Sequence, residues 1–594
     1  MTGAVEAGDR PADAALDAHS VTLPSMFAAT VDRFPDAVAV RSGVEPGAGA
    51  LTWQQYREQV ARAVTGLSHL GLSHGDRVVM MTTNRPEFYV ADTAVAHLGG
   101  VAVSVYNSSA PEQIRYVVEH CGGRGLVIEE RFGDRVLEAI RDVPTVAWLV
   151  VIGDKVPSGA TPWVDVLAAE PADLDAVARS VSPDDLATVI YTSGATGPPK
   201  GVMLTHACIA WQTTAMLARI DQPTDGWRTI SYLPMAHIGE RMMGHYLAIR
   251  GAMQVTCCAD PAGVHPFLGA VRPQIFLGMP RTWEKLHAEL ASVIDAMPAA
   301  ERREVELALD TPAARGPVDD EHAAVLTSLR RQVGMEDGRV MLTGGGVLGG
   351  ETQAFFRRLR LPLSDIYGMS ESTGPISWSP YDSPPGRVGR PMPGCDVRID
   401  VDGEVLFRSR TAFAGYLNDP QRTAETEAPD GFVRTGDIGE FDDDGWLRIV
   451  DRKKDLLITA GGKNIAPALL ESALQAFPII ARVAVVGEQR PFVAALVTVD
   501  ETAARQLASA PDALLFDLTE HAAVRAAIDD ALAAVNARFS RAEQIRRVVV
   551  LPDQWMPDSA VLTPTSKLKR RAVNDLYRDQ IESLYATSDQ KWTP

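Results

Sequence analysis

The chain has 594 residues, more than one ordinary hydrophobic core can accommodate, so two or more domains are expected. Hydrophobic residues make up 46% of it and charged residues 22%, as in soluble globular proteins. The formal net charge of −19 argues against a general nucleic-acid-binding protein, because no basic excess would neutralise phosphates, whereas one local cationic pocket is compatible with it.

Residues 1–20 are acidic and alanine-rich without an apolar core, which predicts a disordered tail rather than a signal peptide. The five cysteines form no C-x-x-C pair, and we interpret them as core residues of a protein from a reducing cytoplasm. The longest apolar stretch, residues 89–106, carries Asp92 and His97 and does not qualify as a membrane span. Peripheral membrane contact and the oligomeric state stay open.

From about Val21 to Val255, helical patterns alternate with short apolar strands. Helices are predicted at residues 51–72 and 86–100, and strands at residues 76–82, 101–106 and 186–193. Strands rich in β-branched residues and joined by helical crossovers indicate a parallel sheet in a layered α/β fold.

The later regions differ in composition. Residues 288–337 are rich in Ala, Glu and Arg and predict exposed helices, whereas residues 394–409 predict short strands of a small β subdomain. Residues 481–500 predict a strand pair, followed by helices to the C-terminus. The charged run 451–455 separates two apolar strands; it is a candidate linker, although charge alone favours a solvated hairpin turn.

The stretch YTSGATGPPKGVMLTH, residues 191–206, combines hydroxyl residues and glycines with one lysine. Its glycines would let backbone N–H groups approach an anion closely and Lys200 would supply charge, so it is a candidate phosphate cradle. It is not a Walker loop, because Gly194, Gly197 and Lys200 lie three residues apart. From composition alone, a flexible surface turn explains it equally well. The loop follows strand 186–193, at the end where open α/β sheets bind ligands.

Five separated motifs help to decide between a phosphate-binding loop and a surface turn: YTSGATGPPKG (191–201), YGMSESTG (367–374), RTGDIG (434–439), DRKKDLLITAGGKNIAP (451–467) and LTPTSKLKRR (562–571). In this order they resemble the signature loop, adenine and magnesium motif, ribose motif, hinge and C-terminal lysine segment of the adenylate-forming (AMP-binding) superfamily. Two further stretches, YLPMAHIGERMMGHY (232–246) and FLGMPRTWEKL (276–286), are similar to the long-chain fatty acyl-CoA synthetase branch.

The resemblance implies an α/β fold with two domains. The large N-terminal domain would contain layered α/β subdomains plus a small β-barrel-like subdomain, and a smaller, mobile α+β C-terminal domain would follow. The predicted boundaries are 1–20 for the tail, 21–451 for the domain that binds AMP and the acyl group, 452–454 for the hinge, and 455–594 for the C-terminal domain.

The resemblance also implies a long-chain fatty acid–CoA ligase that uses a fatty acid, ATP and coenzyme A as substrates and Mg²⁺ as cofactor. A fatty carboxylate would attack the α-phosphorus of ATP to give acyl-AMP and pyrophosphate, and coenzyme A would then displace AMP. A fatty acyl-AMP ligase that loads a carrier protein is the enzymatic alternative. A non-catalytic nucleotide-binding relative is disfavoured, because Lys567, Glu371 and Asp437 are all present.

The nucleotide site follows from the same resemblance. The pyrophosphate end of ATP would be held by Thr192, Ser193, Gly194, Thr196, Gly197 and Lys200. Ala195 replaces the family's usual hydroxyl residue, at an expected cost of about 1 kcal/mol. Tyr367, followed by Gly368, would stack on adenine, and Asp437 and Arg452 would contact the ribose. The opposite wall would be Gly344, Gly345 and Gly346, which without the family context would be only a turn.

Glu371 is the expected Mg²⁺ ligand, together with Thr192, because a hard dication that bridges phosphates needs oxygen ligands. Outside this context it would be a surface glutamate at a helix end. Lys567 would bridge the substrate carboxylate and the α-phosphate, with Lys569 or a merely solvated basic tail as the open alternatives. His237 would lie between the acyl and nucleotide pockets, or else be a packed core histidine.

In the family, the C-terminal domain swings about a hinge residue between an adenylating and a thioester-forming pose. By its position in the run DRKKD, Lys454 would be the pivot in this chain. Gly461, Gly462 and Lys463 would face coenzyme A in the second pose.

Overall fold

The structure is a computed structural model that describes residues 20–192, 198–310, 322–346, 348–460, 463–556, 559–563 and 567–586. Several predicted site residues lie outside these ranges: Ser193, Gly194, Ala195, Thr196, Gly197, Gly461 and Gly462. The predicted tail also falls almost entirely outside them, since the described residues begin at Ser20.

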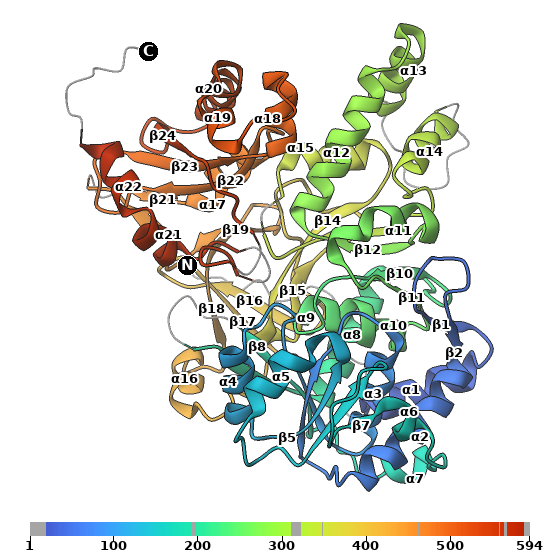
Figure 1. Cartoon of the computed structure of the whole chain (residues 1–594). Coiled ribbons are helices and arrows are strands. Elements are labelled where there is room, and N and C mark those ends of the chain that lie inside the picture. Colours follow the sequence, from blue (N-terminus) through green and yellow to red (C-terminus); the bar gives the residue numbers. More distant parts are fainter. Residues whose placement is uncertain are drawn as a thin grey trace.

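A seven-stranded sheet forms one layer of the large domain (Figure 1). In spatial order its strands are β7 (Thr161–Pro162), β6 (Trp148–Ile152), β5 (Gly123–Glu129), β3 (Arg77–Met81), β4 (Val101–Ser104), β8 (Leu186–Thr192) and β9 (Lys200–Thr205). All neighbours pair in parallel except β8 and β9, which are antiparallel. The accompanying helices are α2 (Trp53–His69), α3 (Pro86–His97), α4 (Pro111–Cys121), α5 (Gly133–Ile140), α6 (Trp163–Leu167) and α7 (Leu174–Ala178). The predicted parallel sheet with helical crossovers is confirmed.

The beginning of α2 shows how local sequence sets these elements. Thr52 accepts a hydrogen bond from the backbone N–H of Gln55, and the Gln55 side chain accepts one from Thr52 N–H, which together form a capping box. The apolar positions Tyr56, Val60 and Val64 recur every four residues and are buried. At its other end the helix stops at His69, with Leu70 as the C-cap, rather than at the predicted residue 72.

Two further four-stranded sheets complete the layered part. One has the order β10 (Arg228–Ser231), β11 (Gln254–Cys257), β1 (Val38–Arg41) and β2 (Ala50–Thr52). The other has the order β12 (Ile275–Gly278), β13 (Val340–Thr343), β14 (Leu363–Met369) and β15 (Gly374–Trp378). The associated helices are α1 (Leu23–Arg33), α8 (His206–Ile220), α9 (Ile238–Glu240), η3 (Arg241–Tyr246), α10 (Leu247–Arg250), α11 (Val264–Val271), α12 (Pro280–Asp295), α13 (Ala299–Asp310), α14 (Ala323–Gln332) and α15 (Gly350–Arg358).

The predicted small β subdomain is an open antiparallel sheet of four strands. Its order is β16 (Cys395–Ile399), β17 (Glu404–Ser409), β18 (Val433–Phe441) and β19 (Leu447–Arg452), and α16 (Pro420–Thr426) lies between β17 and β18 in the chain. Strands β18 and β19 pair through the register Asp437 to Arg452, which places two predicted ribose contacts opposite each other.

The C-terminal domain forms a separate lobe beside α12 and α15 (Figure 1, orange to red). Its elements are β20 (Leu457–Ile458), β21 (Asn464–Ile465), α17 (Pro467–Gln475), β22 (Ile480–Val486), β23 (Val493–Val499), α18 (Glu501–Ala508), α19 (Leu515–Glu520), α20 (Ala522–Asn536), β24 (Ile545–Leu551), α21 (Arg570–Leu576) and α22 (Arg578–Tyr585). Along β23, Val493, Ala495 and Val497 belong to one core cluster and Ala494 and Leu496 to another, so helices cover both faces of the sheet.

Two sequence predictions need correction. The region after residue 500 was expected to be helical, but it contains β24, which pairs in parallel with β23. Arg546 and Arg547 interrupt the apolar pattern of this edge strand, so hydrophobic periodicity does not predict it. The described parts of residues 288–337 do form helices, the end of α12 with α13 and α14, and α13 projects from the body (Figure 1), but Leu309 and Leu326 are buried, so these helices are not simply exposed.

The prediction that the cysteines are core residues is confirmed. All five cysteines are buried and unpaired. Burial raises the pKa of Cys121 and Cys395 to about 12, which keeps these thiols protonated and unreactive. Within the described part of the chain, no helix combines the length and the apolar character that crossing a membrane requires.

Candidate active site

A cavity of about 1880 Å³ lies between the large domain and the C-terminal domain. Its walls include every described residue of the predicted site except Lys463: Thr192, Lys200, His237, Gly344, Gly345, Gly346, Tyr367, Gly368, Glu371, Asp437, Arg452, Lys454 and Lys567. Residues that are up to 375 positions apart in the sequence, from Thr192 to Lys567, therefore meet in one space. The N–H of Lys463 donates to Thr459 Oγ1 (3.2 Å), and its exposed side chain lies outside this cavity.

Glu371 lies on a short 3₁₀ turn, η5 (Ser370–Ser372), that joins β14 to β15. The residue is only 7% exposed, and its Oε1 accepts a hydrogen bond of 2.6 Å from the hydroxyl of Tyr416. Lys200, at the start of β9, places its Nζ 4.7 Å from the centre of the Tyr416 ring. Burial lowers the pKa of Lys200, and the charge of Glu371 opposes this. A carboxylate and an ammonium group thus flank one tyrosine on the cavity wall.

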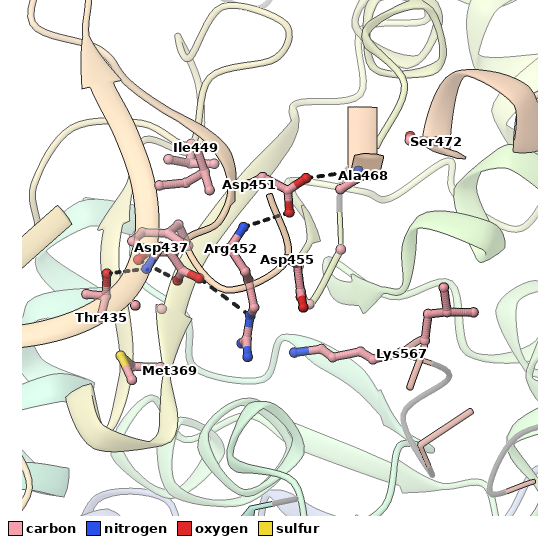
Figure 2. A pocket seen from close by; sticks show the side chains of 18 of the residues that line it. Met369, Thr435, Asp437, Ile449, Asp451, Arg452, Asp455, Ala468, Ser472 and Lys567 are labelled. Carbon is pink, nitrogen blue, oxygen red and sulfur yellow. Dashed lines mark hydrogen bonds and ion pairs between the residues drawn. The ribbon is translucent and has the colours of Figure 1, made fainter. Parts of the chain in front are cut away.

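The predicted ribose contacts form a connected group (Figure 2). Arg452 Nε lies 3.5 Å from Asp437 Oδ1. The hydroxyl of Tyr367 donates to Asp437 Oδ2 at 2.8 Å. Burial raises the pKa of Asp437, and the guanidinium of Arg452 opposes this rise. Asp437 therefore has two acceptor oxygens, both oriented by neighbours on the cavity wall.

Two positions near this group require glycine, each for a different structural reason. Gly345 has a φ of +77°, a backbone conformation that residues with a side chain rarely adopt. At Gly368, a Cβ atom would lie 1.9 Å from the carbonyl oxygen of Gly374, so the close approach of β14 to β15 requires glycine. Gly345 thus lets the segment after β13 turn along the cavity, and Gly368 lets the hairpin close beside Tyr367.

Lys567 enters the cavity from the C-terminal domain. Its N–H donates to Thr563 Oγ1 (2.9 Å) and its carbonyl accepts from Thr563 N–H (2.8 Å), which fixes the backbone that carries the side chain. In Figure 2 its amine points toward the guanidinium of Arg452. The side chain is exposed to the cavity, yet desolvation by the surrounding walls lowers the pKa of Lys567 to about 8. The charge of Arg452 contributes to this lowering of the pKa, and the charges of Asp437 and Glu371 oppose it.

The two candidate lysines now differ. The Nζ of Lys569 donates to the backbone carbonyl of Ser559 at 2.9 Å, within its own domain. The charge of Lys567, in contrast, acts on His237, Asp437 and Glu371 of the large domain. Both lysines line the cavity, but the amine of Lys569 is bonded within its own domain, whereas the charge of Lys567 is directed toward the large domain.

His237 caps the N-terminus of α9 and lines the cavity. Its Nδ1 accepts a hydrogen bond from Gly239 N–H (3.1 Å), which leaves the proton of the neutral ring on Nε2. Burial and the charge of Lys567 lower the pKa of His237 to about 4, so the ring is neutral near pH 7. The cavity lining also includes the apolar side chains of Ile190, Met216, Leu233, Ile238, Met242, Met243 and Leu277.

The predicted hinge follows directly after β19. The Nζ of Lys453 pairs with Asp402 (2.6 Å) and Glu404 (2.9 Å), which fixes this residue to the large domain. One residue later, the side chain of Lys454 is exposed toward the cavity and makes no comparable pair in the described residues. Asp455 N–H donates back to the carbonyl of Arg452 (2.9 Å), so the chain turns here and then enters β20.

The sequence did not reveal three residues of this cavity. Tyr416 was overlooked because the segment GYLNDP predicts only a turn, and its contact with Glu371 spans 45 positions. Asp365 lies two residues before Tyr367 on β14; burial raises its pKa to about 8, and its Oδ1 has no partner among the described residues. Asp451 accepts from Ala468 N–H (3.0 Å) and so joins the two domains (Figure 2). Only its place in the run DRKKD could have indicated Asp451.

The cavity residues fit a magnesium ion held mainly by substrate phosphates. No cluster of three or more His, Cys, Asp or Glu residues suited to a metal occurs within the described ranges. Mg²⁺ commonly uses one or two carboxylates and completes its shell with water and phosphate oxygens. The buried carboxylate of Glu371, with one oxygen already oriented, matches that donor set.

Comparisons with known proteins agree with this geometry. Residues 27–417 match the AMP-binding enzyme family, and residues 454–589 match the AMP-binding enzyme C-terminal domain. The chain is 33% identical to the long-chain-fatty-acid–CoA ligase FadD15 of Mycobacterium bovis over 93% of its own length and 95% of that protein. It is 31% identical to the long-chain-fatty-acid–CoA ligase ACSBG2 of Xenopus laevis, over 97% and 85% of the two chains.

Solved structures support the fold. The adenylation and carrier didomain of a carboxylic acid reductase from Segniliparus rugosus, in complex with AMP, aligns with a TM-score of 0.76 at 19% identity, over 97% of this chain and 84% of that one. A Mycobacterium tuberculosis fatty acyl CoA synthetase aligns with a TM-score of 0.62 at 22% identity, over 94% and 99%. The chain belongs to the AMP-binding enzyme family, in the branch of the long-chain-fatty-acid–CoA ligases, and has the adenylate-forming fold.

Proposed function

We propose that this protein activates a fatty acid with ATP to give acyl-AMP and pyrophosphate, and then transfers the acyl group to coenzyme A with release of AMP. The observation that carries the proposal is one cavity whose lining combines the polar residues of the nucleotide motifs, a lysine from the C-terminal domain and several apolar side chains. The family supports the reaction, and the substrates named for the relatives support a fatty acid.

In the first half-reaction, the protein must bring a carboxylate onto a polyanion. Lys567 is proposed to hold the fatty carboxylate against the α-phosphate, and Lys200 to bind the pyrophosphate end of ATP. At about 4 Å and an effective dielectric constant of about 20, one such ion pair contributes roughly 4 kcal/mol, or about a thousandfold in rate if it forms only in the transition state. Bound Mg²⁺, when held by Glu371 and Thr192, would neutralise phosphate charge. The chain contributes positioning and charge rather than a nucleophile.

The remaining residues are proposed to bind the rest of the two substrates. Asp437 and Arg452 would contact the ribose, while Tyr367 and the glycines 344–346 would enclose the adenine. The neutral ring of His237 would separate the reacting carboxylate from the acyl chain. The cavity lining includes Met216, Met242 and Met243, whose flexible side chains suit an alkyl chain.

We further propose that Lys454 is the pivot about which residues 455–594 turn between the half-reactions. The pairs of Lys453 with Asp402 and Glu404 support a pivot at the next residue, because the chain is anchored up to that point. The structure has Lys567 in the cavity and Lys463 outside it, as an adenylating pose requires. In the second pose, Gly461, Gly462 and Lys463 would replace Lys567 beside the acyl-AMP and admit the thiol of coenzyme A.

We place the enzyme in the reducing cytoplasm, as the five unpaired cysteines support. Contact with a membrane surface would be peripheral.

A pyrophosphate-release screen across saturated acids from short to very long tests the proposal, followed by acceptor assays with coenzyme A and with an acyl carrier protein. We expect turnover with long-chain acids and thioester formation on coenzyme A. Turnover confined to aromatic or very short acids would contradict the fatty-acid assignment. Transfer to the carrier protein but not to coenzyme A would contradict the second half-reaction alone.

A further inference from the structure

Tyr416 connects two groups on which the proposed adenylation depends, although it belongs to none of the motifs identified in the sequence. Its hydroxyl donates to Glu371 Oε1 at 2.6 Å, and its ring lies under Lys200, with Nζ 4.7 Å from the ring centre. The residue is 4% exposed and lines the nucleotide cavity. A short hydrogen bond to a carboxylate and a cation over an aromatic face are both stabilising contacts.

The backbone around Tyr416 is fixed to both segments that it links. Ala414 N–H donates to Met203 O (2.9 Å) and Leu417 N–H to Gly201 O (2.8 Å), which lays the segment along β9, the strand that begins with Lys200. Phe413 N–H donates to the carbonyl of Glu371 at 2.9 Å. The tyrosine is therefore anchored beside the lysine strand and the glutamate turn at once.

The Tyr416 hydroxyl occupies one oxygen of Glu371 and so sets the direction of the other. A metal-binding carboxylate is commonly held in this way by a neighbouring donor, and loss of that donor typically weakens metal binding by about tenfold or more. The ring restricts where the Lys200 ammonium can lie, because the ammonium is attracted to the ring face.

We infer that Tyr416 is a positioning residue for the first half-reaction: its hydroxyl orients the Glu371 carboxylate and its ring seats the Lys200 ammonium, so that both face the phosphate end of ATP. The inference rests on the proposed roles of Glu371 and Lys200. It assigns to Tyr416 no contact with the substrate itself and no part in thioester formation.

The test uses the full-length protein with Tyr416→Phe, which removes the hydroxyl and keeps the ring. Binding of Mn²⁺ together with α,β-methylene-ATP is measured by electron paramagnetic resonance, and the Mg²⁺ concentration for half-maximal adenylation by pyrophosphate exchange. We expect Mn²⁺ binding to weaken by about tenfold and the Mg²⁺ requirement to rise in parallel. Conversion of supplied acyl-AMP to acyl-CoA should stay within about twofold, which also shows that the variant is folded.

Tyr381→Phe is the matched control. It also removes a phenol hydroxyl, which donates to the carbonyl of Ile220 at 2.7 Å, but Tyr381 does not line the cavity. This variant should bind Mn²⁺ and nucleotide as the wild type does. Tyr416→Leu removes the ring as well, so it should bind the nucleotide more weakly than Tyr416→Phe even without a metal; equal binding would overturn the role of the ring.

Unchanged Mn²⁺ binding in Tyr416→Phe would overturn the inference, and so would equal loss of both half-reactions, because that indicates a purely structural role. Glu371→Ala separates this failure from failure of the proposed function. If Glu371→Ala loses Mn²⁺ binding while Tyr416→Phe does not, only the inference about Tyr416 is wrong. If Glu371→Ala binds Mn²⁺ normally, the metal assignment itself is wrong. In the Glu371→Ala background, Tyr416→Phe should have no further effect on Mn²⁺ binding.

Discussion

Glu371 and Lys567 line the same cavity but are held there in opposite ways. Glu371 is buried, and both its side chain and its carbonyl are hydrogen-bonded within the large domain, to Tyr416 and Phe413. Lys567 belongs to the C-terminal domain, where its backbone is hydrogen-bonded to Thr563, and its charge acts on groups of the other domain. The first group is therefore in place in any arrangement of the domains, whereas the second is in place only while they are docked as seen here.

The docking itself depends on few polar contacts among the described residues. Arg281 at the start of α12 donates to the carbonyl of Ala481 (2.6 Å) and lies 3.7 Å from Asp500, both in the C-terminal domain. Asp451 accepts from the N–H of Ala468 at the start of α17. Such contacts are weak enough to break during a catalytic cycle, since exposed ion pairs contribute about 0–1 kcal/mol.

The largest effect is expected from Glu371→Ala. Adenylation should fall by about a thousandfold or more, because the phosphate charge that Mg²⁺ neutralises would lose its protein ligand. Conversion of supplied acyl-AMP to acyl-CoA should persist, because that step involves no pyrophosphate. Pyrophosphate exchange and acyl-CoA formation, measured on the same preparation, check this. Normal exchange in a folded variant would remove Glu371 from the site.

Lys454→Pro should affect the two half-reactions differently, because proline fixes φ near −65° and so restricts rotation of the C-terminal domain about this residue. We expect part of the adenylation activity to remain and thioester formation to fall by about a hundredfold. Lys454→Ala is the control, because it removes the charge but leaves the backbone free. If both variants lose thioester formation equally, the charge rather than the hinge is responsible.

The pH dependence of adenylation should reflect Lys567. Desolvation and the charges of Arg452 and Lys454 lower its pKa to about 8, and the protonated form is the active one. The kcat/KM for ATP should therefore fall as pH rises through about 8, by up to about tenfold per pH unit, while use of supplied acyl-AMP should not. Lys567→Arg, which stays charged, should abolish this decline where it retains activity. The same decline in Lys567→Arg would assign it to another group.

The smallest effect is expected at the docking surface. Arg281→Ala should lower adenylation by about twofold to fivefold, the range of one exposed ion pair, and should leave thioester formation unchanged or faster. Arg358→Ala is the matched control, because Arg358 has nearly the same side-chain exposure (48% against 49%) and pairs with Asp310 inside the large domain. An equal loss of adenylation in both variants would contradict a specific role for the interface.

The residues that could be predicted from the sequence are those whose chemistry is concentrated in short motifs. Tyr367 and Glu371 lie in the eight-residue motif YGMSESTG, and Asp437 and Arg452 lie in the motifs RTGDIG and DRKKD. Tyr416 could not be predicted, because its role depends on a contact across 45 positions that only packing creates. The choice between Lys567 and Lys569 likewise required the structure, because both line the cavity but the amine of Lys569 donates to Ser559, whereas the amine of Lys567 points toward Arg452 (Figure 2).

The strands likewise include some that the sequence predicts and one that it does not. The parallel sheet around β3 and β4 follows from uninterrupted apolar runs between helical segments. Strand β24, in contrast, carries arginines at positions 546 and 547. It forms a strand because it pairs in parallel with β23, and this is a tertiary contact rather than a local preference of the sequence.

The central claim is that Lys567 serves one half-reaction and Glu371 stays in place for both poses. Lys567→Ala, supplied in separate reactions with fatty acid plus ATP and with preformed acyl-AMP plus coenzyme A, tests it most directly. We predict that acyl-AMP formation falls by about a thousandfold while acyl-AMP is converted to acyl-CoA at close to the wild-type rate. Equal damage to both half-reactions in the folded variant would contradict the two-pose account, and the assignment of Lys567 would be wrong with it.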